Sequence, residues 1–382
     1  MRSEARVDLS AIRDNVRVLR ERAAGGAQVM AVVKADGYGH GLVPSAHAAV
    51  EGGAAWLGVA FVEEALAVRA AGITTPMLAW LFGADEDLAP VVAADVDLGV
   101  YSLAELVRAQ EAAHRTGRTA RLHLKVDTGL SRGGATLAAW PDLCAAAAKA
   151  EADGSVSVTG LWSHFAFADG GPDHPTNGRQ AVVFAEALEV AAATGLQPEV
   201  RHLANSAATL TAPGTHYDLV RPGVAVYGLS PVPQLGAPGD FGLRPAMTLA
   251  STVVLTKQVP AGSGVSYLHR YTTPSETTLA LVPLGYADGV PRGATNVVEV
   301  LLGGVRRRIA GTVCMDQFVL DVGADNAGST AAAVGDEVLL FGPGDSGEPT
   351  AQDWADWLGT INYEVVTRIG ARVPRSYRGG SA

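Results

Sequence analysis

The sequence has little of what disulfide-rich, metal-binding or membrane-spanning proteins require. Its 382 residues include two cysteines, Cys144 and Cys314, which are too few for a disulfide framework and form no CxxC motif. The histidines and carboxylates do not cluster at metal-ligand spacing, so we expect no metal site. The sequence contains no run of about 18 uninterrupted apolar residues, and so we predict no spanning helix.

Positive charge is also scarce in any one stretch. The net charge is −10 and no segment is rich in lysine and arginine, which argues against nucleic acid and anionic membranes as partners. The N-terminal segment MRSEARVDLSAIRDN is charged rather than apolar and does not resemble a secretory signal. We therefore expect a protein of the reducing cytoplasm.

Short apolar runs alternate with helical patterns over the first two-thirds of the chain. Helical patterns at 62–72, 103–117 and 179–195 each end on glycine, a common helix stop. Continuous apolar strands between helices are typical of a parallel sheet covered on its faces. The predicted strands are residues 27–35, 54–61, 76–82, 96–102, 120–128, 158–166, 199–206 and 217–228.

Eight strand–helix units in fewer than about 240 residues match a (β/α)8 TIM-like barrel. A doubly wound open sheet is the alternative, but no GxGxxG fingerprint follows the first strand. The sequence therefore favours the barrel.

The composition changes at the Pro- and Gly-rich connector 228–245. Beyond it, the segments TLASTVVLTKQV, TTLALVPLGYAD, RRRIAGTVCMDQFVLDV and GDEVLLFG indicate a mainly antiparallel β domain. We predict one helix within it, at 350–359, because Thr350 and Asp353 have capping-box spacing. The predicted fold class is thus α/β, with the barrel in 1–235 and the β domain in 236–382. The first few N-terminal residues are candidates to pack on the β domain.

Polar residues follow several of the predicted strands, where a barrel carries its active face. A lysine at a strand end offers a Schiff-base amine, and small or hydroxylated residues after the last two strands offer a phosphate site. With aromatic and basic neighbours, these are the requirements of pyridoxal phosphate. Taken alone, Lys34 is better explained as a strand-end lysine that reaches solvent. The candidates are Lys34, Tyr38, Lys125, Asp127, Arg132, Ser163, His164, His202, Asn205, Ser206, Arg221 and Gly223.

The ordered set of motifs VKADGYGHG, HLKVDTGLSRGG, HLANSAA, RPGVAVYG, GYADG and CMDQ resembles the alanine racemases. The resemblance extends from the first helix to TINYEV near the end of the chain. It implies a fold-type III barrel that binds pyridoxal 5′-phosphate, followed by a β domain. It also implies interconversion of L-alanine and D-alanine by a homodimer with shared active sites, and D-alanine supply for peptidoglycan.

The resemblance also implies a role for individual residues. Lys34 would hold the cofactor as an internal aldimine and act as one catalytic base, and Tyr286 of the partner subunit would be the second. Arg132 and Met315 would contact the substrate, supported by Asp316 and by Lys125, which is often carbamylated in this family. The implied cofactor-binding residues are Lys34, Tyr38, His164, Asn205, Ser206, Arg221, Gly223, Val224 and Tyr363.

These roles agree with the chemistry of racemisation, which removes a proton from one face of Cα and returns it to the other. A lysine and a tyrosine have reference pKa values of about 10.4 and about 10, so their surroundings must assist them as bases. Arg221 would face the pyridine nitrogen and donate to it without giving up its proton. The cofactor would then be a weaker electron sink, which disfavours side reactions.

Three other functions are alternatives. A decarboxylase of the same fold would pair the pyridine nitrogen with a carboxylate, where this sequence has Arg221. A non-catalytic carrier of the cofactor would need neither the β domain nor Tyr286. A racemase of broad specificity, or one that prefers serine, is a closer alternative because one extra hydroxyl changes binding by only about 1–3 kcal/mol in an apolar pocket.

Overall fold

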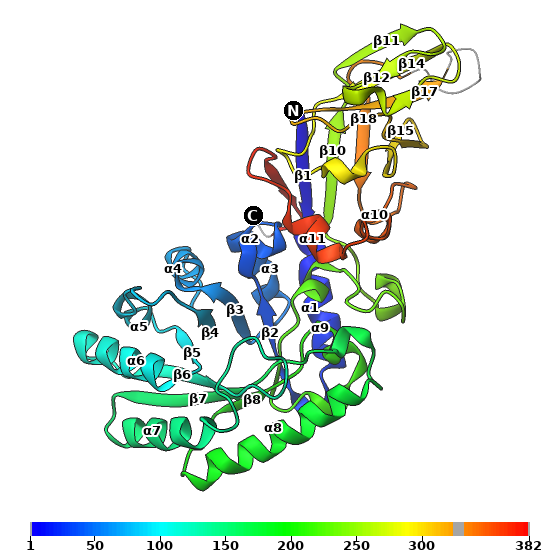
Figure 1. Cartoon of the computed structure of the whole chain (residues 1–382). Helices are drawn as coiled ribbons and strands as arrows, with labels where there is room; N and C mark the ends of the chain where they lie inside the picture. Colours follow the sequence, from blue (N-terminus) through cyan, green and yellow to red (C-terminus); the bar gives the residue numbers. More distant parts are fainter. Residues whose placement is uncertain (1, 324–331, 381–382) are drawn as a thin grey trace. The chain divides into compact units, whose positions relative to one another are not determined.

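The computed structural model describes residues 2–323 and 332–380. The chain divides into two compact units (Figure 1). Residues Ile12–Leu243 form one, which we call the barrel unit. Residues Met1–Ala11 and Arg244–Ala382 form the other, the β unit.

The barrel unit contains eight parallel strands, each hydrogen-bonded to the next in one sheet. Its two edge strands are joined by backbone hydrogen bonds from Asp218 to Arg201 (3.1 Å) and from Arg221 to Ala204 (2.9 Å), so the ring is nearly closed. The predicted barrel is confirmed, and the open-sheet alternative is wrong. The strands are β2 (Gln28–Val32), β3 (Trp56–Phe61), β4 (Met77–Leu81), β5 (Asp97–Val100), β6 (Ala120–Lys125), β7 (Val156–Trp162), β8 (Val200–His202) and β9 (Leu219–Val220).

Helices α4 to α8 lie on the outside of these strands in Figure 1. Local signals set their ends: the Ser102 hydroxyl accepts a hydrogen bond from the Glu105 amide at the start of α6, and Gly117 ends it with φ of 66°. The helices are α1 (Leu9–Arg22), α3 (Leu42–Glu51), α4 (Val62–Ala70), α5 (Ala89–Ala93), α6 (Leu103–Thr116), α7 (Trp140–Ala152), α8 (Pro175–Ala193) and α9 (Ser206–Thr211).

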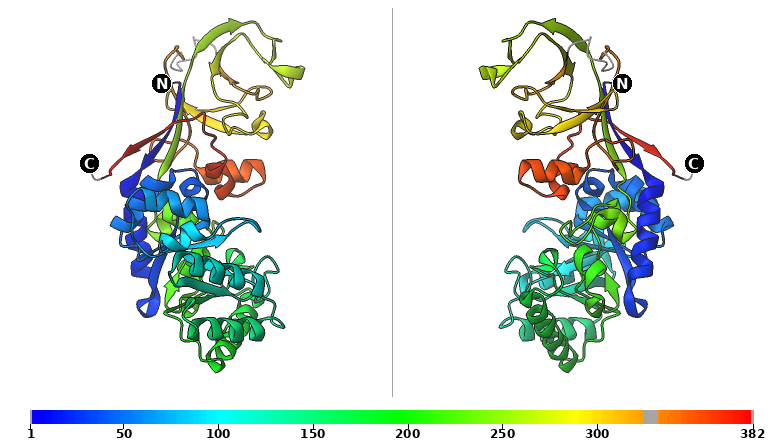
Figure 2. Two further views of the ribbon diagram at one scale, coloured as in Figure 1. Left: turned by 90° about the vertical axis from the view of Figure 1, so that its left-hand side faces the viewer. Right: turned by 90° about the vertical axis from the view of Figure 1, so that its right-hand side faces the viewer.

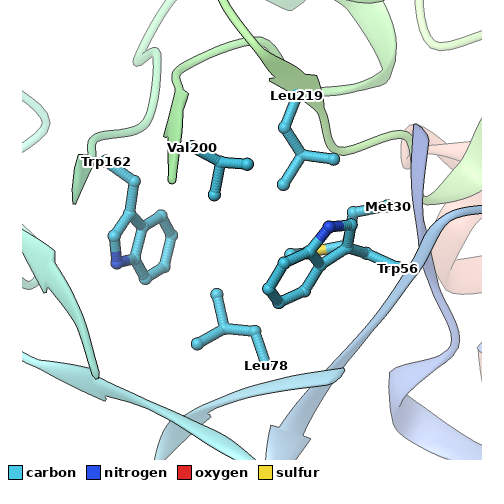
Figure 3. Packing of buried hydrophobic residues seen from close by; sticks show 6 residues of the cluster. All are labelled: Met30, Trp56, Leu78, Trp162, Val200 and Leu219. Atoms are coloured by element: carbon cyan, nitrogen blue, oxygen red, sulfur yellow. The ribbon is translucent and has the colours of Figure 1, made fainter. Parts of the chain in front are cut away.

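Large apolar side chains fill the interior of the barrel. One buried cluster takes a residue from each of six strands, and the side chains converge on one another (Figure 3). Burial of this kind stabilises by roughly 1.5–3 kcal/mol per large side chain and fixes which face of each strand points inward. The cluster consists of Met30, Trp56, Leu78, Trp162, Val200 and Leu219.

Several predicted strands are shorter than the apolar patterns suggested, and two of them bear on the site. The pattern 217–228 gives only Leu219–Val220 as strand, followed by a 3-10 turn at Val224–Tyr227. Pro222 has no N–H to continue the ladder, and its carbonyl oxygen accepts from the Val32 amide at 3.0 Å. The pattern 27–35 ends at Val32, before Lys34.

The β unit is built on a six-stranded sheet with the order β16-β15-β18-β10-β1-β19. Its pairs are antiparallel except β1 with β19, which places the first and last strands side by side (Figure 2). A three-stranded sheet and a two-stranded ribbon complete the described strands. The strands are β1 (Ser3–Asp8), β10 (Met247–Thr252), β11 (Leu255–Val259), β12 (Gly264–Val265), β13 (Tyr271–Thr272), β14 (Thr277–Val282), β15 (Glu299–Leu302), β16 (Val305–Arg308), β17 (Phe318–Gly323), β18 (Glu337–Phe341) and β19 (Arg375–Arg378).

The predicted helix of the β unit is present as α10 (Ala351–Leu358), with the reciprocal Thr350–Asp353 capping box and Gly359 at its end. The expectation of a single helix is wrong, because α11 (Asn362–Thr367) follows it. Helix propensity does not predict this helix, because it contains the β-branched residues Val365, Val366 and Thr367. Burial of the two valines stabilises it. Within the described ranges, no helix is long and apolar enough to span a membrane.

Candidate functional site

Lys34 leaves strand β2 through an unusual backbone turn. The turn is α2 (Lys34–Tyr38), in which Ala35 and Asp36 have φ of 53° and Tyr38 has φ of 52°. Left-handed conformation costs about 1–2 kcal/mol for each such residue. Glu64 helps to hold the turn, because its carboxylate accepts from the amide of Ala35 at 2.7 Å. The strain therefore serves to direct Lys34 and Tyr38 after the strand ends.

Tyr38, Ser206 and Gly223 come together at the carboxyl ends of the first and last barrel strands. The Ser206 hydroxyl accepts from the amides of Gly223 (2.7 Å) and Ala225 (3.4 Å). A Cβ on Gly223 would lie 2.2 Å from the Tyr38 hydroxyl oxygen, so only glycine leaves that hydroxyl its place. These hydroxyls and amides, beside the start of α9 at Asn205, make a small cradle with anion-binding chemistry.

Arg221 is buried and follows β9. Its Nη1 donates to His202 Nδ1 at 3.0 Å, and its Nη2 reaches His164 Nδ1 at 3.1 Å and the carbonyl oxygen of Ser163 at 2.7 Å. The Leu203 carbonyl oxygen is a fourth acceptor, at 3.3 Å from Nη2. Every acceptor is neutral, and the described residues offer none to the Nε–H. Burial lowers the pKa of Arg221 to about 9, which still leaves it protonated at neutral pH.

Lys125 ends strand β6 and lies between aromatic rings. Its Nζ is 4.6 Å from the centre of the Trp162 ring and 5.1 Å from that of Tyr101. Burial, together with the positive charges of Arg221 and Arg132, lowers the pKa of Lys125 to about 8. A substantial part of this amine is therefore neutral near physiological pH.

Arg132 lies in the loop that folds back on β6. Asp127 shapes the loop by accepting from three successive amides, those of Gly129, Leu130 and Ser131, at 2.9–3.1 Å. The backbone then returns to pair Ala135 with Lys125 and Asp127. Arg132 is exposed, and its charge lowers the pKa of Lys34, after burial as the larger cause.

Four cations thus share the mouth of the barrel, by which we mean the carboxyl ends of its strands and the loops that follow. They are Lys34, Lys125, Arg132 and Arg221, and none forms an ion pair with a carboxylate among the described residues. Burial and the charge of Arg221 also hold the pKa of His164 well below its usual range, so this imidazole is neutral. Uncompensated positive charge in a partly buried site favours an anionic ligand.

The β unit brings Tyr286 and Met315 together. The Tyr286 amide donates to the Cys314 carbonyl oxygen and the Ala287 amide to that of Met315, both at 3.0 Å. A Cβ on Gly285 would lie 2.3 Å from both carbonyl oxygens, so glycine permits this close approach. Both side chains remain exposed, Tyr286 by 45% and Met315 by 52%.

A buried carboxylate fixes this loop. Asp288 accepts from the Gly285 amide at 2.9 Å and forms ion pairs with Arg2 (3.4 Å) and Arg372 (3.1 Å). Arg372 also pairs with Asp316 at 2.7 Å, which places Asp316 beside the same loop. Tyr363, the last predicted site residue, lies on α11 in the β unit.

The structure therefore gathers the predicted residues into two groups, one in each unit. Sequence reasoning missed Asp97 and His123, which lie behind Arg221 in the barrel interior. Both sit inside apolar strand patterns, and the only signal was a charged residue in an otherwise hydrophobic run. Glu64 was missed as well, because nothing in its helical pattern distinguishes it from a surface glutamate.

The fold and the cationic mouth define an α/β-barrel enzyme with a site for an anionic ligand. Residues 7–231 match the family model for the alanine racemase N-terminal domain, and residues 246–377 match that for the alanine racemase C-terminal domain. The chain belongs to the alanine racemase family.

Individual relatives agree along the whole chain. It is 65% identical over 377 residues to the alanine racemase of Frankia casuarinae, covering 99% of this chain and 96% of the relative. It is 61% identical over 378 residues to that of Salinispora arenicola, covering 99% and 98%.

Solved structures are similarly close. The alanine racemase from D-cycloserine-producing Streptomyces lavendulae has a TM-score of 0.96 and 53% identity, covering 100% of this chain and 98% of that one. The alanine racemase from Streptomyces coelicolor has a TM-score of 0.95 and 54% identity, covering 98% of each chain.

The close approach of Gly223 to Tyr38 predicts the effect of a single methyl group. We expect Gly223→Ala to lower the free energy of unfolding by about 1–3 kcal/mol, because the new Cβ overlaps the Tyr38 hydroxyl. Urea unfolding measures this. Tyr38→Phe should restore part of the loss, since the ring carbon Cζ would still lie 2.9 Å away.

Gly214→Ala is the matched control, because a Cβ there meets nothing within 4 Å. If Gly223→Ala and Gly214→Ala are equally stable, the Tyr38 hydroxyl does not occupy this position.

Proposed function

We propose that the chain interconverts L-alanine and D-alanine with pyridoxal phosphate bound at the mouth of the barrel. The single observation that carries this proposal is the set of four cations without carboxylate partners, one of which is the strand-end amine of Lys34. Membership of the alanine racemase family disfavours a decarboxylase, a carrier or a racemase that prefers serine. The family also suggests the cellular role, D-alanine supply for peptidoglycan.

The residues at the mouth fit the cofactor. When bound, pyridoxal phosphate supplies an aldehyde for amines and a ring that withdraws electrons from the substrate Cα. Lys34 would hold the aldehyde carbon, and the leftover Nε–H of Arg221 suits the pyridine nitrogen. The hydroxyls of Tyr38 and Ser206, which meet at Gly223, suit the phosphate. The proposed phosphate contacts are Tyr38, Asn205, Ser206, Tyr363 and the amides of Gly223 and Val224.

Burial and the charge of Arg132 lower the pKa of Lys34, so a larger fraction of its amine is free to take a proton at neutral pH. Lys34 would take or return the proton on one face of Cα. Tyr286 of the partner subunit would serve the other face. His164 accepts from Arg221 through Nδ1, so its proton lies on Nε2 and would point towards that tyrosine.

The substrate carboxylate needs its own donors. Arg132 and the amide of Met315 from the partner subunit are the proposed contacts, with Asp316 and Lys125 in support. The exposure of Tyr286 and Met315 on the β unit supports a homodimer in which they complete the partner's site. A location in the reducing cytoplasm stays a prediction, which the free thiols of Cys144 and Cys314 support.

Solvent deuterium tests the reaction directly. We expect the purified protein loaded with pyridoxal phosphate to place deuterium at Cα of both L-alanine and D-alanine with inversion, and to leave L-serine and L-lysine nearly unexchanged. Mass spectrometry and chiral chromatography measure the products. Cofactor binding without exchange into any amino acid would contradict the proposal and favour a carrier.

A mixing experiment tests whether two chains share each site. Lys34→Ala and Tyr286→Phe should each lose nearly all racemisation, because each removes one base. After random reassociation, mixed dimers have one intact site of two, so the mixture should recover about a quarter of wild-type turnover. Each variant reassociated with itself is the control. No recovery, with mixed dimers detected by native mass spectrometry, would show that both bases come from one chain.

The pKa of Lys125, about 8, predicts that this amine reacts with carbon dioxide. A carbamate there would place a negative charge among Arg132 and Arg221, which favours it. We expect ¹³C-bicarbonate to give a carbamate carbon resonance in the wild type and none in Lys125→Met. The signal should weaken as pH falls below 8, because the protonated amine does not react. An identical signal in Lys125→Met would assign the carbamate elsewhere.

A further inference from the structure

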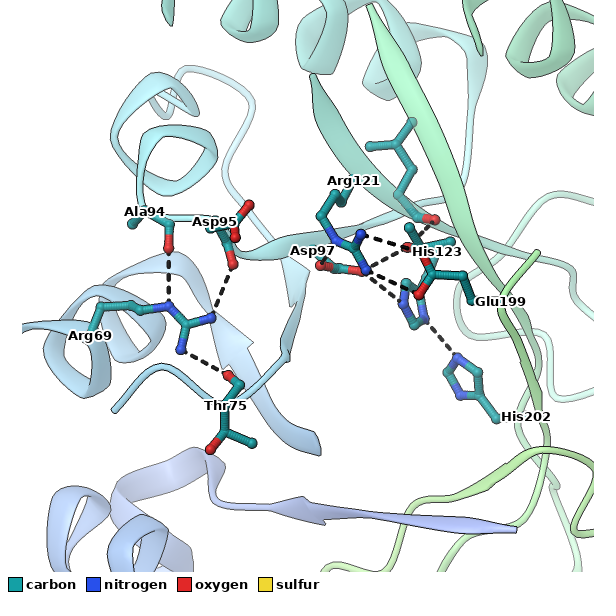
Figure 4. A network of polar contacts seen from close by, with 11 residues as sticks. Arg69, Thr75, Ala94, Asp95, Asp97, Arg121, His123, Glu199 and His202 are labelled. Carbon is teal, nitrogen blue, oxygen red and sulfur yellow. Dashed lines mark hydrogen bonds and ion pairs between the residues drawn. The ribbon is translucent and has the colours of Figure 1, made fainter. Parts of the chain in front are cut away.

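A chain of buried hydrogen bonds, which we call the relay, runs through the barrel interior and ends on Arg221. Asp97 Oδ2 lies 3.2 Å from His123 Nε2, and His123 Nδ1 lies 2.8 Å from His202 Nε2. His202 Nδ1 then meets Arg221 Nη1 at 3.0 Å. The first two contacts are drawn in Figure 4, and the three residues come from β5, β6 and β8. None of the four side chains is more than marginally exposed.

The chemistry of the guanidinium sets the direction of every bond in this chain. An arginine only donates, so His202 must accept at Nδ1 and carry its proton on Nε2. His123 must then accept at Nδ1 and carry its proton on Nε2, which it donates to Asp97. Both imidazoles are therefore neutral and share one tautomer. A charged or reversed ring at either position would place N–H against N–H.

Asp97 anchors the far end. Thr159 Oγ1 donates to Oδ2 at 2.6 Å, and Arg121 Nε donates to Oδ1 at 2.9 Å. Burial alone would raise the pKa of Asp97, but the hydrogen bonds from His123 and Thr159 and the positive charge of Arg121 lower it, so the carboxylate stays ionised. Arg121 reaches on to the exposed Glu199 at 3.4 Å, as Figure 4 shows.

The surrounding packing holds the two rings in place. Trp162 stacks on His202 with ring centres 5.6 Å apart and planes 9° apart, and Trp56 meets His123 edge-on at 5.3 Å. Strand β7 passes His123 at Gly160, where a Cβ would lie 2.3 Å from His123 Nδ1. That nitrogen is the atom that accepts from His202, so glycine at this position leaves room for the hydrogen bond between the two rings.

We propose that Asp97, His123 and His202 are positioning residues that hold Arg221 in the orientation it needs to face the cofactor. The relay moves no proton: it supplies an acceptor of fixed tautomer to Nη1 and so leaves the Nε–H as the donor for the ligand. The effect of the relay on turnover rests on the proposed function, whereas the histidine tautomers are independent of it.

The tautomers are tested on the wild-type protein by NMR with ¹⁵N-labelled histidine. We expect the His123 and His202 rings to be neutral with the proton on Nε2, both with and without pyridoxal phosphate. His123→Gln and His202→Gln assign the resonances. An imidazolium, or an Nδ1 proton on either ring, would overturn the proposal, and this test depends on no variant of Asp97.

Asp97→Asn tests the consequence for Arg221. Asparagine offers one carbonyl oxygen to three donors, those of His123, Thr159 and Arg121, and turns an N–H towards at least one of them, so the anchor of the relay is weakened. We expect kcat for alanine to fall about tenfold with KM changed less than about twofold, and the His123 Nε2 resonance to shift. Pyridoxal phosphate should still bind.

Glu199→Gln is the matched control, since it makes the same carboxylate-to-amide change at the exposed end of the network. It should leave kcat within about twofold of wild type and the histidine resonances unmoved. If Asp97→Asn behaves like Glu199→Gln while the wild type racemises alanine, the positioning role is wrong and the proposed function stands. If the wild type does not racemise alanine, the proposed function fails, and the tautomers measured by NMR still show whether the hydrogen bonds of the relay run as proposed.

Discussion

Positive charge held without a carboxylate partner is the constraint on which the barrel unit depends. A buried arginine normally pairs with an acid, but Arg221 is surrounded by two imidazole nitrogens and two carbonyl oxygens. These acceptors bind Nη1 and Nη2 without cancelling the charge of the guanidinium. The amines of Lys34 and Lys125 likewise lie over aromatic rings and not beside carboxylates. The mouth therefore keeps a positive field for an anionic ligand.

Burying this charge costs free energy, and side chains in the interior of the barrel offset that loss. The nearest ionised acid in the relay, Asp97, is separated from Arg221 by two neutral rings, so it orients the guanidinium without forming an ion pair with it. The left-handed turn after β2 is a second cost, which the Glu64 hydrogen bond and the packing of Tyr38 offset. Both features exchange local stability for a fixed geometry at the mouth.

Much of the fold follows from periodicity, because most of the barrel strands are largely apolar runs between helices. The strand ends were less predictable: nothing in KADGY announces a left-handed turn, and Pro222 shortens β9 although the apolar pattern continues. Helix α11 was missed because its buried valines have the composition of a strand.

The candidate site was predictable through its ordered motifs, which named the residues at the mouth. Asp97 lies outside these motifs, and His123 opens one of them without a role assigned to it. Their partners come from other strands, so only the folded barrel brings them together. A hydrogen-bond direction is likewise invisible in a sequence, since it is fixed by which atoms meet.

The pairing of β1 with β19 has a consequence for how the protein is made. The β unit takes strands from both ends of the chain, so its central sheet lacks a member until residues Arg375–Arg378 leave the ribosome. The barrel unit is continuous, and all of its strand pairs except β2 with β9 join strands that follow one another along the chain, so it can fold before the β unit is complete. The lysine-bearing half of the enzyme can therefore form first, and the tyrosine-bearing half is completed only after β19 has been made.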